Sequence, residues 1–339
     1  MRIALKTALL CMALASSGFA SIEHSQAAEN KKIATQKKKS KVAPVTLKGK
    51  SSIAVKKRSA VVSFASVEHG QDSRILAVHS GSALVVDQSG GDAIFQKNAS
   101  TVVPIASITK LMTAMVVLDS TPNLQASVSI TDEDVDYLRG SHSRLHVGSV
   151  VSRETALLLA LMSSENRAAH ALARQYPGGV PAFLDAMNSK AHALGMRNTR
   201  FEDPTGLTSN NVSTAHDLAK LVSAAYRYPL IRELSTTSSA TVEVSGREMA
   251  YRNTNPLVKN PAWDVGVSKT GYIHEAGKCL VMQARLADKP VVIVLLDSVG
   301  KMTRVGDANR IKRWMESAQA SHKLPTRAAL SSERTLPKG

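Results

Sequence analysis

The sequence has little cysteine and few aromatic residues: two cysteines in 339 residues, with Phe, Trp and Tyr together at 4%. Cys11 lies in an N-terminal segment that we expect to be removed, which leaves Cys279 alone. A single cysteine excludes an internal disulfide. Because Cys279 falls in an apolar, strand-like stretch, we expect a small buried hydrophobe there rather than a reactive thiol.

Long apolar runs are also missing, since no segment approaches 18 uninterrupted apolar residues. A membrane-spanning helix needs about 20. Near the N-terminus, Arg2 and Lys6 precede the apolar residues 8–15, and small residues follow. This pattern is typical of a secretory signal peptide, here residues 1–28 with cleavage between 20 and 28. It predicts an exported protein, which we expect in the periplasm.

Acidic residues are absent from residues 31–60, which contain eleven Lys or Arg. Residues 61–339 hold 30 basic and 25 acidic residues, so the charge of +16 is concentrated near the N-terminus. We expect residues 29–70 to be a disordered basic linker. The basic residues have no aromatic residues between them, so nucleic acid is not an expected partner. Contact with an anionic wall or membrane surface is the alternative to a plain spacer.

Two catalytic signatures are missing as well. Without a Gly-x-Ser-x-Gly elbow an α/β-hydrolase is not expected, and without His-Glu-x-x-His a zinc peptidase is not. His142 and His146 are four residues apart but flank a predicted hairpin, where polar loop histidines are the usual interpretation. We expect no metal and no cofactor.

The hydrophobic periodicity predicts strands, then a helical block at 152–235, then strands and a final helix. This order indicates an α+β fold: a mostly antiparallel sheet built from both ends of the chain, with a helical lobe inserted between them. The folded domain is expected over 75–320, followed by a flexible tail at 321–339. The predicted strands are 83–87, 93–97, 128–130, 240–244, 249–253, 263–269, 280–286 and 291–296, with a hairpin at 144–151. The predicted helices are 108–118, 155–162, about 167–176, 180–194, 214–221 (limited by Pro229) and 305–317.

The stretch 104–118 carries the first candidate chemistry. Pro104 is expected to open a helix, with Ser107 in its first turn and Lys110 on the same face, Cβ atoms about 5–6 Å apart. A serine needs an adjacent base to act as a nucleophile. Lysine can be that base only if its pKa falls from about 10.4 toward 7–8, through burial or a second cation. Alone, Ser-x-x-Lys also fits a helix cap with a surface lysine, and Ser298 with Lys301 forms a second copy.

Two further motifs complete a set. Ser164-Glu165-Asn166 interrupts two predicted helices, where side chains can face a cleft. Lys269-Thr270-Gly271 ends a predicted strand, and its glycine allows a close backbone approach. Each motif alone is weak, and residues 209–211 form another Ser-x-Asn. Their order and structural context match serine acyl transferases that react with penicillin.

The chain resembles the low-molecular-mass penicillin-binding proteins over about residues 75–320. Among them it is similar to D-alanyl-D-alanine endopeptidases of the penicillin-binding protein 7 type. This resemblance implies a β-lactamase/transpeptidase-like fold, with an antiparallel five-stranded sheet flanked by helices and an inserted all-helical lobe. It also implies a peptidoglycan stem-peptide substrate and β-lactam antibiotics as acylating inhibitors. The segments that carry it are 106–115, 161–169, 176–179, 204–207, 252–255 and 269–271.

The resemblance also implies roles for individual residues. Ser107 would be the nucleophile, Lys110 its base, and Ser164 a proton relay to the leaving amine. The remaining residues would bind substrate: Asn166, Lys269, Thr270 and Gly271, with the backbone N–H groups of Ser107 and Tyr272 forming the oxyanion hole.

Three functions stay open at this point. The first is a DD-endopeptidase that cuts D-alanyl-(D)-diaminopimelate crosslinks, and the second is a DD-carboxypeptidase that removes terminal D-alanine. The third, a non-enzymatic wall-binding or β-lactam-sensing module, is disfavoured by the intact motifs. The sequence lacks Glu-x-x-Leu-Asn, which class A β-lactamases use for deacylation, and this favours a penicillin target over a penicillin-destroying enzyme.

Overall fold

The computed structural model describes residues 76–323, and the side chains of residues 76–320. The expected signal peptide (1–28), the basic linker (29–70) and nearly all of the expected tail (321–339) therefore lie outside the described residues. No helix in the described part of the chain has the length and apolar character needed to cross a membrane.

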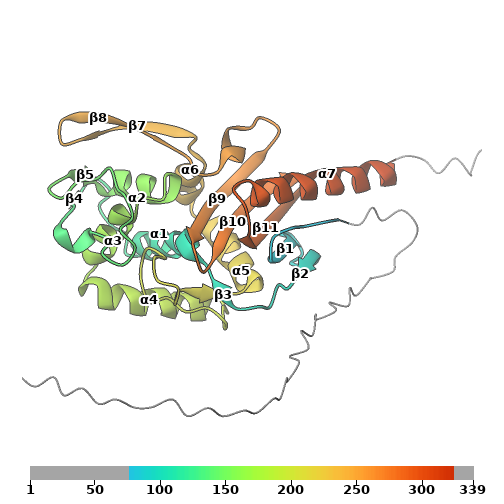
Figure 1. Cartoon of the computed structure of the whole chain (residues 1–339), viewed down its shortest axis with the longest axis horizontal. Helices are drawn as coiled ribbons and strands as arrows, with labels where there is room; N and C mark the ends of the chain where they lie inside the picture. Colours follow the sequence, from blue (N-terminus) through green and yellow to red (C-terminus); the bar gives the residue numbers. More distant parts are fainter. Residues whose placement is uncertain (1–75, 324–339) are drawn as a thin grey trace, which may run out of the picture. The chain divides into compact units, whose positions relative to one another are not determined.

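A five-stranded antiparallel sheet forms the centre of the domain, in the order β2-β1-β11-β10-β9 (Figure 1). It combines the two ends of the folded region, as predicted. Its strands are β1 (Ser82–Asp87), β2 (Ala93–Lys97), β9 (Asp264–Ile273), β10 (Gly277–Leu286) and β11 (Lys289–Ser298). Strand β9 lies at the edge of the sheet, which leaves one side of its backbone free to face other groups.

Both faces of the sheet are covered, because successive side chains of a strand point to opposite faces. In β10, Val281 faces the large core shared with the helical lobe, whereas Leu280 and Met282 face a second core. The helix α5 (Ala215–Ala225) packs on the first face. The long C-terminal helix α7 (Thr303–Lys323) covers the second face and buries Ile311.

The helical lobe is inserted between β2 and β9, also as predicted. Its helices are α1 (Thr109–Asp119), α2 (Arg153–Met162), α3 (Asn166–Arg174), α4 (Gly179–Ala193), α5 and α6 (Pro229–Thr236). Ser152 caps α2 by accepting a hydrogen bond from the Thr155 N–H, and Thr214 caps α5 in the same way. Three two-stranded pairs complete the domain: β3 (Val103–Pro104) with β6 (Val212–Ser213), β4 (Ser127–Ser129) with β5 (Val150–Ser152), and β7 (Ser239–Val244) with β8 (Arg247–Arg252).

Two local predictions were wrong, and one helix was not predicted. Pro104 does not open a helix; it ends β3, opposite Val212, and the helical backbone starts two residues later. Residues 144–151 are not a hairpin, because only their end is a strand and it pairs with β4 from an earlier part of the chain. Pro229 limits α5 but also occupies the first turn of α6, where proline is well tolerated.

A buried carboxylate ties α3 to the short 3-10 helix η2 (Asp132–Asp134). The side chain of Asp134 is fully buried and lies 2.8 Å from His170 Nδ1 and 2.9 Å from an Arg174 guanidinium nitrogen. Burial raises the pKa of Asp134, but hydrogen bonds from His170, Arg174 and the Thr131 N–H outweigh it and lower this pKa to about 2. This carboxylate therefore stabilises the fold mainly in its charged form.

Replacing this carboxylate should destabilise the lobe. We expect Asp134→Asn to lower the free energy of unfolding by about 2 kcal/mol at pH 7, measured by urea denaturation. Because the folded-state pKa is depressed, the contribution is complete above about pH 4 and declines as the pH falls toward 2. The exposed neighbour Asp132 is the control, and Asp132→Asn should stay within about 0.5 kcal/mol. Equal losses in the two variants would contradict this account.

Candidate active site

Ser107 lies in a tight turn at the start of α1. The turn is the 3-10 helix η1 (Ala106–Ile108), and Ala106 has a left-handed backbone with φ of 49°. The Ile105 N–H donates to the Asn211 carbonyl, and the Thr109 hydroxyl donates to the Ala106 carbonyl. These bonds fix the turn on both sides of Ser107 and place its hydroxyl at the entrance to a buried helix.

Lys110 is completely buried one turn further along, an unusual position for a lysine. Its Nζ lies 2.9 Å from Ser107 Oγ, 2.7 Å from Asn166 Oδ1 and 2.7 Å from the Thr205 carbonyl oxygen. The amide and carbonyl oxygens can only accept hydrogen bonds. In a neutral Lys110 they take both N–H groups, and the nitrogen lone pair is left to accept the Ser107 O–H.

Burial lowers the pKa of Lys110 from 10.5 to about 7, although the negative charges of Asp203, Glu165 and Asp136 oppose the change. Burial, followed by the charges of Lys110 and Arg304, holds the pKa of Lys269 well below its ordinary value. A lysine with a pKa near 7 is a competent general base at neutral pH. Burial thus gives Lys110 the lowered pKa that a lysine base requires, a requirement that the sequence predicted but could not test.

The second motif is brought to the same place. Ser164 follows α2 with a left-handed backbone, φ of 64°, a conformation that costs a non-glycine residue on the order of 1–3 kcal/mol. Its Oγ accepts a hydrogen bond of 2.9 Å from Lys269 Nζ. Asn166 opens α3, and its Nδ2 donates to Ser141 Oγ at 2.9 Å. Residues from three distant parts of the chain are therefore brought together: Lys110 contacts both Ser107 and Asn166, and Ser164, two residues before Asn166, contacts Lys269.

Strand β9 supplies the opposite wall. Lys269 is buried, and Thr270 Oγ1 donates to Thr254 Oγ1 at 2.6 Å. A Cβ on Gly271 would lie 3.1 Å from the Ser107 nitrogen, so the absence of a side chain lets β9 approach the nucleophile turn. Tyr272 follows on this edge strand. The backbone N–H groups of Ser107 and Tyr272 stay a predicted oxyanion hole, and the close approach of β9 to η1 is consistent with it.

The sequence motifs did not identify the residues that support Lys110 and Asn166 through hydrogen bonds. Thr205 supplies a carbonyl to Lys110, and the Asp203 carboxylate organises the Thr205 loop by accepting N–H groups from Thr205, Gly206 and Thr208. Ser141 contacts Asn166 from a loop with no recognisable motif. The segment 203–206, Asp-Pro-Thr-Gly, was the available signal, because it is a typical turn sequence.

Gly206 is a second point of close approach. It has φ of 82°, and a Cβ at this position would lie 2.0 Å from the Ala106 carbonyl oxygen. We expect Gly206→Ala to displace the nucleophile turn and to slow penicillin acylation at least about 100-fold, because errors of about 1 Å have effects of this size. Stopped-flow acylation with a fluorescent penicillin would measure it.

Gly195 provides a matched control, because it has φ of 69° but no atom within 4 Å of its would-be Cβ. Gly195→Ala should cost about 1 kcal/mol in unfolding free energy and leave acylation intact. Normal acylation in Gly206→Ala would show that this contact does not position Ser107.

The other candidates lie elsewhere. Ser298, in the second Ser-x-x-Lys, is buried at the end of β11 against the Ser80 hydroxyl, whereas Lys301 is exposed. Asn211, in the second Ser-x-Asn, braces the nucleophile turn through Thr109. Cys279 is buried, with its pKa raised to about 11 by burial, as expected of a small hydrophobe. In the part of the chain that the structure describes, no group of three or more metal-ligating side chains occurs.

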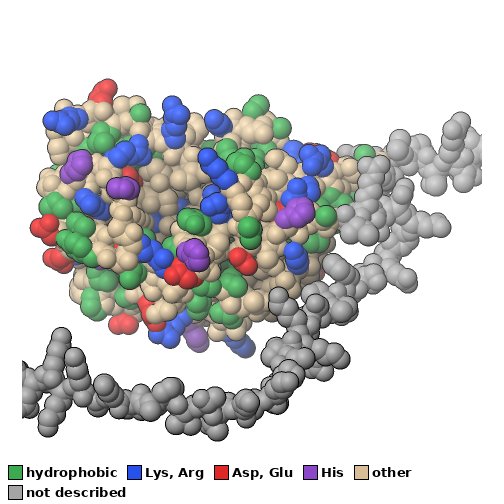
Figure 2. Space-filling view, viewed as in Figure 1, with side chains coloured by type: hydrophobic (Ala, Val, Ile, Leu, Met, Phe, Trp, Pro, Cys, Tyr) green, Lys and Arg blue, Asp and Glu red, His purple; other side chains and the backbone are tan. Residues whose placement is uncertain are grey.

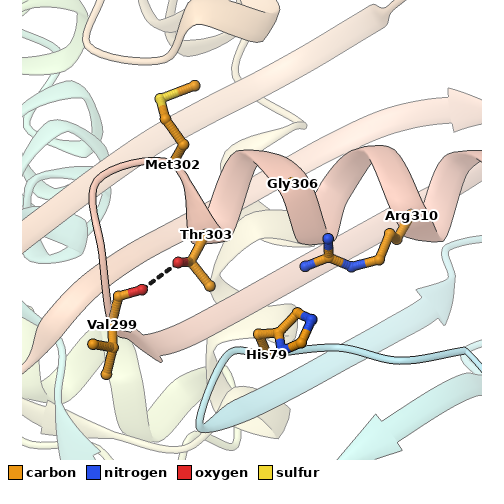
Figure 3. A pocket seen from close by; sticks show the side chains of 6 residues that line it. All are labelled: His79, Val299, Met302, Thr303, Gly306 and Arg310. Carbon is orange, nitrogen blue, oxygen red and sulfur yellow. Dashed lines mark hydrogen bonds between the residues drawn. The ribbon is translucent and has the colours of Figure 1, made fainter.

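A cavity of about 480 Å³ lies away from this chemistry, beside the first turns of α7 (Figure 3). His79 and Arg310 point toward each other across it, and Val299 and Met302 form its exposed apolar edge. None of the predicted site residues lines it. We therefore assign the chemistry to the site formed by Ser107, Lys110, Ser164 and Lys269.

The fold, together with Ser107 beside the buried Lys110 amine, is that expected of a serine acyl transferase. A family model described as D-alanyl-D-alanine carboxypeptidase matches residues 67–300, and the chain belongs to this family. A D-alanyl-D-alanine endopeptidase of Pseudomonas aeruginosa is 52% identical over 244 residues, covering 71% of this chain and 79% of the relative. An endopeptidase of the same description from Escherichia coli is 47% identical over 254 residues, covering 74% and 81%.

Solved structures agree on the fold. The Streptomyces K15 DD-transpeptidase has a TM-score of 0.67 at 31% identity, covering 71% of this chain and 98% of that protein. Penicillin-binding protein D2 of Listeria monocytogenes, in an ampicillin-bound form, has a TM-score of 0.62 at 27% identity, covering 71% and 99%. The predicted β-lactamase/transpeptidase-like α+β fold is confirmed.

Proposed function

We propose that this protein is a serine DD-endopeptidase that hydrolyses D-alanyl-(D)-diaminopimelate crosslinks of peptidoglycan through an acyl-enzyme. The observation that carries the chemistry is the buried Lys110 amine, 2.9 Å from Ser107 Oγ, with its two N–H groups directed to other acceptors. The two endopeptidase relatives at 52% and 47% identity support the choice of bond.

Acylation begins when Ser107 Oγ attacks the D-alanine carbonyl while Lys110 takes the hydroxyl proton. The backbone N–H groups of Ser107 and Tyr272 stabilise the oxyanion. As the carbon–nitrogen bond breaks, the proton passes from Lys110 through Ser164 to the leaving amine. The leaving group carries a carboxylate beside that amine, and Lys269 with Thr270 binds it. In the free protein, burial disfavours the charged form of Lys269. The bound carboxylate, being negative, favours that charged form.

Water then attacks the acyl-enzyme and regenerates Ser107. A β-lactam follows the same first step, because its ring amide stands in for the scissile peptide bond, and its opened product stays on Ser107. The chain contains no Glu-x-x-Leu-Asn motif to speed release. The ampicillin-bound Listeria relative supports this inhibition.

The second candidate is a DD-carboxypeptidase, favoured by the description of the family as a whole. Both activities use the same residues, so substrates must separate them. Incubation of the mature protein with crosslinked muropeptide dimers and with pentapeptide monomers, analysed by mass spectrometry, should give dimer cleavage without loss of terminal D-alanine. Trimmed monomers with intact dimers would contradict the endopeptidase assignment.

The place of action is part of the proposal. A signal peptide at residues 1–28 would deliver the enzyme to the periplasm, where it would act in cell-wall biogenesis and cell shape, and the basic segment 29–70 would contact anionic wall or membrane surfaces. The charged and apolar pattern of the N-terminus supports export. N-terminal sequencing of protein from a periplasmic extract should find a start between residues 21 and 29. A chain that retains Met1 in the cytoplasm would contradict it.

A further inference from the structure

A salt bridge joins two turns beside the proposed active site. An Arg139 guanidinium nitrogen lies 3.0 Å from each carboxylate oxygen of Glu275. Arg139 belongs to a turn at residues 136–141, and Glu275 belongs to the turn between β9 and β10. The Arg139 side chain is 25% exposed and that of Glu275 44%, so both charges remain accessible to a ligand.

Hydrogen bonds connect the Arg139 turn to the active-site residues. The Asp136 carboxylate accepts the backbone N–H groups of Leu138, Arg139 and Ser141, which fixes the turn. Ser141 in turn accepts the hydrogen bond from Asn166 described above. Arg139 Nε donates to the Leu207 carbonyl in the loop that holds Lys110. The guanidinium is therefore held at a fixed place next to the catalytic groups.

The direction of β9 indicates which part of a bound substrate would lie near Arg139 and Glu275. In the proposed reaction the leaving-group carboxylate binds at Lys269 and Thr270, and the attacked carbonyl binds at Ser107, which lies beside Gly271. The acyl part of the substrate, on the other side of the scissile bond, must extend further along β9 toward Glu275. Four residues of strand span at most about 13 Å. The residue before the scissile D-alanine, with a side chain of several carbons, is long enough to reach that far.

Three large apolar or aromatic side chains close in sequence to the active-site residues are exposed. Tyr137 is 82% exposed, Leu138 68% and Tyr272 58%, which are large values for such side chains. Figure 2 shows basic side chains over much of the face seen in Figure 1, with acidic ones mainly on its left and lower parts. The exposed apolar side chains and the Arg139–Glu275 pair would suit a ligand that combines an aliphatic chain with one positive and one negative group.

We propose that Arg139 and Glu275 bind the free zwitterionic end of the diaminopimelate side chain on the acyl-donor stem peptide. This inference rests on the proposed function. The side chain has three methylene groups, which fit the rim formed by Tyr137, Leu138 and Tyr272. Its terminal carboxylate pairs with Arg139, in the bidentate geometry that guanidinium favours, and its ammonium pairs with Glu275. When the ligand binds, the salt bridge between Arg139 and Glu275 is replaced by one ion pair from each residue to the ligand. Neither side-chain charge is therefore left unpaired.

Three crosslinked dimers test this inference: one unmodified, one amidated at the donor side-chain carboxylate, and one acetylated at the donor side-chain amine. We expect the wild type to cleave each modified dimer with a kcat/KM about tenfold below that of the unmodified dimer. Glu275→Gln should remove the penalty for acetylation and keep that for amidation, whereas Arg139→Gln should do the reverse. This crossed pattern would not arise from a purely structural role.

His274→Ala, in the same turn, is the matched control and should keep both penalties. Because Arg139 also holds the Leu207 carbonyl, Glu275→Gln alone suffices if Arg139→Gln does not fold. Equal cleavage of all three dimers by the wild type, or a uniform loss in Glu275→Gln, overturns the inference while the endopeptidase assignment stands. A wild type that reacts with penicillin but cleaves no dimer overturns the proposed function, and the inference with it.

Discussion

Ser107→Ala is expected to abolish reaction with labelled penicillin and cleavage of every peptide substrate. The Ser107 hydroxyl is the only side-chain nucleophile that the proposed reaction uses, and removal of such a group costs on the order of 10⁴-fold or more. The variant should fold normally, because the Ser107 side chain forms no hydrogen bond except the one to Lys110 among the described residues. Mass spectrometry after incubation with penicillin would show an unmodified protein.

The second Ser-x-x-Lys provides the control for this prediction. Ser298→Ala should retain full penicillin uptake and lose only the buried hydrogen bond to Ser80, about 1 kcal/mol of stability. If Ser107→Ala were still acylated, the nucleophile would lie elsewhere and the assignment of the groove would be wrong.

Lys110→Met should have the second largest effect. Methionine fills a similar volume in the apolar helix but cannot accept a proton, so acylation should slow about 10²–10⁴-fold. Ser107 stays in place, and penicillin should therefore still acylate it slowly over long incubations. Stopped-flow acylation measures the rate, and circular dichroism checks the fold.

Lys301→Met tests the other lysine motif and should react at the wild-type rate, because the Lys301 side chain is exposed and the serine of its motif, Ser298, is hydrogen-bonded to Ser80. A Lys110→Met rate within about threefold of the wild type would contradict the role of Lys110 as the base.

The sequence predicted the fold through its periodicity. Short apolar runs at 83–87, 280–286 and 291–296 located the central strands. The apolar helix predicted over 108–118 begins next to Ser107, three residues before Lys110. Because neighbours at i and i+3 on a helix lie on one face, their contact followed from spacing alone. The prediction that Pro104 opens a helix was wrong, because proline is equally well tolerated at the end of an edge strand.

Long-range contacts could not be predicted in this way. Spacing does not reveal that Lys269 reaches Ser164, 105 residues away, or that the Thr205 carbonyl receives a Lys110 N–H. The Thr205 contact involves a backbone group, which leaves no trace in the residue type. The salt bridge between Arg139 and Glu275 joins two loops without motifs, so only the folded chain shows it.

The pH dependence of acylation tests most directly whether neutral Lys110 is the base. The second-order rate constant for penicillin acylation should rise with pH and reach half of its maximum near pH 7, where Lys110 loses its proton. Glu165→Gln removes a carboxylate that raises the pKa of Lys110, so the midpoint should move to lower pH. A rate that is constant from pH 5.5 to 9, or a midpoint that Glu165→Gln moves upward, would contradict the account.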